Sequence, residues 1–142
     1  MGILVLFDND GVLRDESQSY ERAVANSVEI LSDGEIATHA ELISSRKATN
    51  NDWERVFYIL KDRGVFGEDE QVENRLPDIK KIFQRLYLGD LVNGRYTGYI
   101  KDETWLADNN LLRELARFTD LAIVSGAPLD EIEYTKNRNE IL

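Results

Sequence analysis

Two short runs of apolar residues lie near the two ends of the chain, and each stops abruptly at a polar turn. The first run covers residues 3–7 and precedes Asp8, and the second covers residues 121–124 and precedes Ser125-Gly126. Continuous apolar runs of this length are typical of strands that are buried on both faces, as in a parallel sheet. The pattern therefore predicts two buried parallel strands.

Between these runs, the apolar residues follow helical spacing. The first helical face breaks at Asp33-Gly34, a short helix is expected over residues 40–47, and a third helical face ends at Gly64. After an acidic loop at 67–73, Pro77 is expected near the start of a fourth helix, where a missing N–H is tolerated. About four helices are therefore predicted over residues 20–88, with these apolar positions: Tyr20, Ala23, Val24, Val28, Leu31, Trp53, Val56, Phe57, Leu60, Ile79, Ile82, Phe83, Leu86 and Tyr87.

The pattern changes again from Val92 onwards. Asn93-Gly94 predicts a turn, residues 95–100 a short extended segment, and residues 108–118 a helix that buries Leu111, Leu112, Leu115 and Ala116. Pro128 predicts the start of a last helix. The fold class expected is α/β, a partial Rossmann-like core of parallel strands (1–15 and 92–142) with an inserted α-helical cap (16–91).

Composition excludes several classes of function. The 142 residues include 27 acidic and 17 basic side chains, a formal net charge of −10, which argues against nucleic acid and anionic membrane surfaces as partners. There is no Cys and a single His, His39, so thiolate sites and sites with two imidazoles are excluded. The N-terminal apolar run is too short for a signal peptide, so a cytoplasmic protein is expected.

The first candidate for chemistry is the segment Asp8-Asn9-Asp10-Gly11-Val12-Leu13. Ligands of open α/β sheets bind beyond the carboxyl ends of the strands, and two carboxylates around one turn can serve as nucleophile and general acid. An ordinary Asp/Gly turn is an equally simple interpretation of the motif alone. A calcium loop fits poorly, because Leu6 and Ser17 would occupy positions that need charge.

Ser125-Gly126 is the second candidate. A hydroxyl and backbone N–H groups between a strand and a helix suit a phosphoryl oxygen, although the pair alone also fits a plain loop. Two adjacent parallel strands would place Asp8, Asp10 and Ser125 on one rim of the sheet, and this combination favours a phosphate site.

With both motifs, the chain resembles the haloacid dehalogenase superfamily of phosphohydrolases. The resemblance rests on two segments, Leu6-Phe7-Asp8-Asn9-Asp10-Gly11-Val12-Leu13 and Ala122-Ile123-Val124-Ser125-Gly126. The helical insert is similar to the family's type 1 cap. The resemblance implies a Mg²⁺-dependent phosphatase acting on a small phosphorylated metabolite. It implies that Asp8 attacks phosphorus, that Asp10 protonates the leaving alkoxide and then activates water, and that Ser125 and Gly126 bind the phosphoryl group. Mg²⁺ would be bound by the Asp8 carboxylate and the Asp10 backbone carbonyl.

The sequence departs from the family pattern after its second motif. A third-motif Lys and an acidic metal-binding pair have no match, so the chain resembles a member truncated at that point. Asp130 and Glu131 are possible substitutes, although charge at a helix N-terminus explains them more simply. Incomplete burial predicts self-association, as a homodimer or a similar assembly. The alternative function is a catalytically weak or inactive relative that acts as a binding or self-association module.

Overall fold

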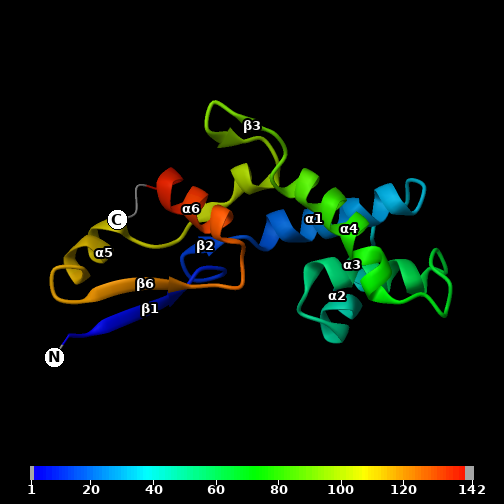
Figure 1. Ribbon diagram of the computed structural model, residues 1–142, viewed down its shortest axis with the longest axis horizontal. Coiled ribbons are helices and arrows are strands. Elements are labelled where there is room, and N and C mark those ends of the chain that lie inside the picture. Colours follow the sequence, from blue (N-terminus) through cyan, green and yellow to red (C-terminus); the bar gives the residue numbers. More distant parts are fainter. Residues whose placement is uncertain (1, 140–142) are drawn as a thin grey trace. The chain divides into compact units, whose positions relative to one another are not determined.

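The computed structural model describes residues 2–139, which divide into two compact units (Figure 1). The first unit is formed by Met1–Glu16 and Glu103–Leu142, and the second by Ser17–Asp102. The sequence pattern predicts a return to the core at residue 92, whereas in the structure the first unit resumes after Asp102. The reason is that residues 99–102 form the 3₁₀ turn η1 (Tyr99–Asp102), whose Ile100 is buried and which packs against the helices of the second unit.

The first unit contains a two-stranded parallel sheet. Strand β1 (Leu4–Asp8) pairs with β6 (Asp120–Val124), with Leu4 opposite Asp120 and Asp8 opposite Val124. The pairing confirms the prediction of two adjacent parallel strands. A second, antiparallel pair joins β2 (Arg14–Asp15) to β5 (Thr104–Trp105). Helices α5 (Asn109–Leu115) and α6 (Leu129–Arg138) complete the unit.

The expectation that both strands are buried on both faces is wrong for the described residues. Exposure alternates along β1, where Leu4 and Leu6 are 59% and 58% exposed while Val5 and Phe7 are partly buried. Val124 of β6 is also exposed. The physical reason is coverage: side chains of α5 and α6 meet one face of the sheet, so only that face loses contact with water. For the same reason Leu111, expected in the core, is exposed while its neighbour Leu112 is buried.

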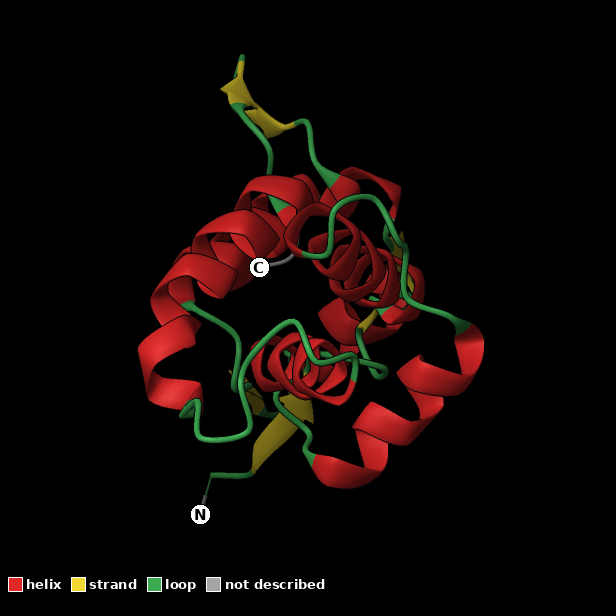
Figure 2. Cartoon of the chain, turned by 90° about the vertical axis from the view of Figure 1, so that its right-hand side faces the viewer, coloured by secondary structure: helices red, strands yellow, loops and turns green. Residues whose placement is uncertain are grey.

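Four helices form the second unit, as the periodicity predicts: α1 (Ser17–Leu31), α2 (His39–Ala48), α3 (Asp52–Asp62) and α4 (Val72–Tyr87). Their contacting faces bury a common core, and Figure 2 shows the helices from another side. The core residues are Ala23, Val24, Val28, Val56, Phe57, Leu60, Ile79, Phe83, Tyr87 and Ile100. The hairpin β3 (Leu91–Val92) and β4 (Arg95–Tyr96) extends away from these helices (Figures 1 and 2).

Two details of this unit differ from the sequence analysis. Pro77 lies inside α4, which begins at Val72. The earlier start is stabilised by Arg75, which pairs with Glu70 at 3.0 Å and lies over the Phe66 ring. The extended segment expected at 95–100 shortens to Arg95–Tyr96, because the chain enters η1 at Tyr99.

Buried ion pairs connect the helices of the second unit. The Arg55 side chain is 3% exposed, and its Nη1 lies 2.6 Å from Glu21 and 2.7 Å from Asp52. Burial tends to raise the pKa of Glu21, but hydrogen bonds from Arg55 and Arg46 outweigh it and lower that pKa. For Asp52, burial prevails and the pKa is raised. Among the described helices, none has the length and apolar character needed to cross a bilayer.

Candidate active site at the ends of β1 and β6

The parallel register brings the two sequence motifs to the same end of the sheet. Asp8 is the last residue of β1 and lies opposite Val124, the last residue of β6. Ser125 follows Val124 directly, and Asp10 is two residues beyond Asp8. The candidate residues Asp8, Asp10, Ser125 and Gly126 therefore all lie at the carboxyl ends of the two strands, where ligands of α/β sheets bind.

A tight turn follows β1 and returns the chain into β2. The N–H groups of Leu13 and Arg14 both donate to the Asn9 carbonyl, at 2.9 and 3.1 Å. Gly11 adopts a φ of 72°, a left-handed conformation that favours glycine. Its N–H donates to the Arg14 carbonyl and to the Glu16 carboxylate, both at 2.8 Å. The turn interpretation of Asp8-Asn9-Asp10-Gly11 is therefore correct as local structure.

The two aspartates of this turn have different surroundings. Asp8 is exposed, and its Oδ1 accepts a hydrogen bond from the Asn9 N–H at 2.7 Å. The Asp10 side chain is 28% exposed, and its Oδ1 accepts hydrogen bonds from Arg14 Nε at 2.7 Å and from Asn9 Nδ2 at 2.9 Å. Asp8 is thus accessible to a ligand, whereas Oδ1 of Asp10 is hydrogen-bonded to two side chains of the protein.

Arg14 is the residue of this region that the sequence analysis missed. Its side chain is 1% exposed and reaches the carboxylates of Asp10, Glu103 and Glu131, at 2.7, 2.9 and 3.9 Å. Its sequence signal was weak, a single Arg beside Val12-Leu13, because its partners Glu103 and Thr135 lie about ninety residues or more further along the chain. Glu131, considered as a substitute metal ligand, lies against Arg14 and is 2% exposed.

Ser125 and Gly126 form the loop between β6 and α6. The Ser125 hydroxyl oxygen accepts a hydrogen bond from the Ala127 N–H at 3.0 Å, which shapes this loop. A hydroxyl that accepts one bond still has its own hydrogen to donate. Gly126 is exposed, and a Cβ added there would meet nothing within 4 Å. The loop conformation itself therefore does not require glycine at this position.

The residues present fit a largely hydrated Mg²⁺ and not an ion enclosed by protein ligands. Among residues 2–139, no three His, Cys, Asp or Glu side chains are grouped as metal ligands. Mg²⁺ is commonly held by one or two carboxylates while water and substrate phosphate fill the other positions. The Asp8 carboxylate and the Asp10 carbonyl offer two oxygens of that kind.

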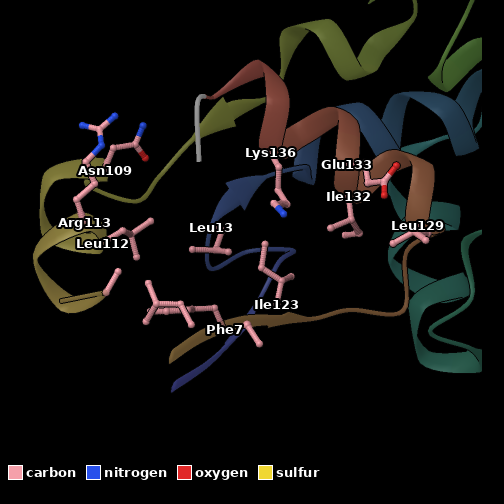
Figure 3. A pocket seen from close by; sticks show the side chains of 13 residues that line it. Phe7, Leu13, Asn109, Leu112, Arg113, Ile123, Leu129, Ile132, Glu133 and Lys136 are labelled. Atoms are coloured by element: carbon pink, nitrogen blue, oxygen red, sulfur yellow. The ribbon is translucent and has the colours of Figure 1, made fainter. Parts of the chain in front are cut away.

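An apolar hollow of about 390 Å³ lies between the sheet and helices α5 and α6. It is lined by side chains of β1, β6, α5 and α6, including Phe7, Ile123 and Ile132, and Figure 3 shows Lys136 directed from α6 toward it. Asp8, Asp10 and Ser125 do not line it. Lys136 therefore lines this hollow.

No protein-family model matches the chain. Among curated proteins, the chain is similar to an imidazoleglycerol-phosphate dehydratase of Phytophthora nicotianae, with 32% identity over 128 residues. That match covers 87% of this chain and 26% of the relative, so the chain spans about a quarter of the relative's length.

Among solved structures, the chain is similar to the phosphatase Tt82 from Thermococcus thioreducens, with a TM-score of 0.70 and 21% identity. The likeness covers 95% of this chain and 68% of that one. It shows a shared fold, and it confirms the α/β class with a parallel sheet that the sequence analysis predicted.

Proposed function

We propose that the chain is a phosphatase of the haloacid dehalogenase type, which hydrolyses a small phosphomonoester through an aspartyl-phosphate on Asp8. The observation that carries the proposal is the register of the sheet, with Asp8 opposite Val124 and Ser125 next along β6. Both residues therefore lie at the same end of the sheet, where ligands of α/β folds bind. The shared fold with a phosphatase supports the same class of reaction.

In this mechanism Asp8 is the nucleophile, since its carboxylate is exposed at the strand end. An oxygen of Asp8 bonds to phosphorus while the ester P–O bond breaks, and Asp10 gives a proton to the leaving oxygen. Asp10 then takes a proton from the water that hydrolyses the aspartyl-phosphate. The Ser125 hydroxyl and the Gly126 N–H bind a phosphoryl oxygen during both steps.

Mg²⁺ is the proposed cofactor, with the Asp8 carboxylate and the Asp10 carbonyl as its protein ligands. When bound, the ion supplies positive charge that offsets repulsion between a phosphate and a chain of net charge −10. The helical unit, Ser17–Asp102, is proposed as the cap that selects the substrate. The curated relative is named for a phosphorylated small molecule, which agrees with the substrate class, but its dehydratase activity is not carried over from a quarter of its length.

The second candidate is a weakly active or inactive relative that acts in binding or self-association. The observation in its favour is the missing group of three metal-ligating side chains among the described residues. Such a protein would bind a phosphorylated ligand at the same strand ends without turning it over.

Hydrolysis of p-nitrophenyl phosphate by the wild type, Asp8→Asn and Asp120→Asn tests the proposal. Asp120→Asn is the matched control, because Asp120 lies opposite Leu4 at the other end of the same sheet. We expect Mg²⁺-dependent turnover by the wild type and the control, a loss of more than about 10³-fold in Asp8→Asn, and no turnover after chelation. Equal activity in all three proteins would contradict the proposal, and an inactive wild type that still binds phosphate would favour the second candidate.

A further inference from the structure

One oxygen of the Asp10 carboxylate receives two hydrogen bonds from the protein. Arg14 Nε donates to Oδ1 at 2.7 Å and Asn9 Nδ2 donates to the same atom at 2.9 Å. Among residues 2–139, no donor to Oδ2 is observed, and the side chain remains 28% exposed. The two oxygens of this carboxyl group therefore differ, because Oδ1 is occupied from within and Oδ2 is left for a ligand.

Arg14 is itself held in place by distant parts of the first unit. Its Nη1 donates to Glu103 at 2.9 Å and to Thr135 Oγ1 at 3.5 Å, and its Nη2 lies 3.9 Å from Glu131. These partners come from the segment before β5 and from α6. A planar guanidinium with contacts on several sides has one orientation in which all are made, so the Nε that faces Asp10 is fixed.

Resting on the proposed function, we infer that Arg14 is a positioning residue, which together with Asn9 holds Oδ1 of Asp10 so that Oδ2 exchanges the proton with the reacting ester. In the first step Asp8 forms a bond to phosphorus, the ester P–O bond breaks, and its electron pair stays on the leaving oxygen. That oxygen takes the proton from Oδ2, which leaves Asp10 as a carboxylate. In the second step Oδ2 takes a proton from the attacking water.

The inference predicts a dependence on the leaving group. An alkoxide or phenolate that is a poor leaving group needs a well-placed proton, whereas p-nitrophenolate leaves without much help. If the Asp10 carboxyl group is free to rotate, hydrolysis of esters with poor leaving groups slows more than hydrolysis of esters with good leaving groups. A general loss of folded protein, in contrast, lowers the rate for every substrate by one factor.

The experiment measures kcat/KM with Mg²⁺ for phenyl phosphate and p-nitrophenyl phosphate, in the wild type and in variants that conserve formal charge. Arg14→Lys keeps the positive charge but loses the planar Nε donor. Asn9→Leu removes the second donor, and it also removes a fully buried Oδ1 that has no partner in the structure, so this variant is expected to fold. For phenyl phosphate we expect a loss of about 10–100-fold in Arg14→Lys and a smaller loss in Asn9→Leu. For p-nitrophenyl phosphate we expect a change of less than about threefold in both.

Arg55→Lys is the matched control, because Arg55 is also a buried guanidinium but belongs to the second unit. It should change kcat/KM for both substrates by the same factor. Asp10→Asn should show the largest loss for phenyl phosphate relative to p-nitrophenyl phosphate. The inference is overturned if Arg14→Lys and Asn9→Leu lower kcat/KM for both substrates by the same factor while Asp10→Asn lowers it mainly for phenyl phosphate. The proposed function would still stand in that case. An inactive wild type, or an Asp10→Asn without selectivity, overturns the proposed function and the inference with it. If Arg14→Lys does not unfold cooperatively on heating, this variant is not properly folded. The kcat/KM values of Asn9→Leu for the two substrates then test the inference.

Discussion

At the residue scale, the turn after β1 shows how one short segment gives two carboxylates different surroundings. Asp8 ends the strand and meets solvent, while Asp10 lies against the buried guanidinium of Arg14. Pairs of acidic groups in different environments are the usual way in which one site obtains both a nucleophile and a proton carrier. In the proposed mechanism, the proton-carrying role of Asp10 depends on Arg14, which lies outside the motif, and on the carboxylates of Glu103 and Glu131 that contact Arg14.

Glu41 offers a pH prediction at the same scale. Hydrogen bonds from Arg63, at 2.6 and 2.8 Å, lower the pKa of Glu41 from 4.5 to about 2. Because the pKa is lower in the folded state, this contribution to stability is complete above pH 4.5 and is lost as the pH falls toward 2. We expect Glu41→Gln to reduce the free energy of unfolding by about 1 kcal/mol at neutral pH.

Urea unfolding of both proteins at neutral pH and at about pH 3.5 checks this prediction. The difference in the free energy of unfolding between the wild type and Glu41→Gln should be smaller at the lower pH. Glu29→Gln provides a control on α1, since Glu29 has no ion pair among the described residues. A difference that stays constant with pH would contradict the assignment.

At the element scale, the close approach of the two chain segments at the base of the hairpin β3–β4 depends on Gly89 and Gly98. The N–H of Gly98 donates to the Leu88 carbonyl at 2.8 Å, and a Cβ on Gly98 would lie 2.4 Å from the Tyr87 carbonyl oxygen. Gly98→Ala should therefore separate η1 from α4 and destabilise the protein by about 2–3 kcal/mol, which thermal unfolding can measure. Gly67→Ala is the control, because a Cβ there meets nothing within 4 Å; equal melting temperatures of the two variants would contradict the prediction.

Periodicity predicted the helices and the parallel strands well, because it reports which side chains avoid water. It could not predict how much of each strand is covered, since an apolar run such as 3–7 is the same whether helices lie on one face or on two. The start of α4 was missed because Pro77 is tolerated best in a first turn, whereas the helix already begins at Val72. Local spacing likewise placed Asp8, Asp10 and Ser125 at the strand ends. Arg14 could not be found, because the carboxylates that bury it, Glu103 and Glu131, are distant in sequence.

At the scale of the whole molecule, self-association remains a prediction, and the exposed face of β1 supports it. Leu4 and Leu6 are more than half exposed, and among the described residues β1 and β6 each have a single strand neighbour. Open strand edges and exposed apolar faces favour association. We expect light scattering at micromolar concentration to give a mass above the 16.3 kDa of one chain.

Leu6→Lys should shift that mass toward the monomer, because it places a charge on the exposed face. Ile30→Lys is the matched control, as Ile30 is 55% exposed on α1 of the second unit. A wild-type mass near that of one chain, together with cooperative unfolding, would refute self-association.

The parallel pairing of β1 with β6 has a consequence for how the chain folds. The two strands are separated in sequence by the whole second unit, Ser17–Asp102, whose helices pack against one another within that unit. Closing so long a loop is entropically costly while the intervening chain is disordered, and local helical contacts form faster than distant strand pairs. We expect the helical unit to form first and so to shorten the search of β6 for β1, which would make the strand ends that carry Asp8 and Ser125 the last part to assemble.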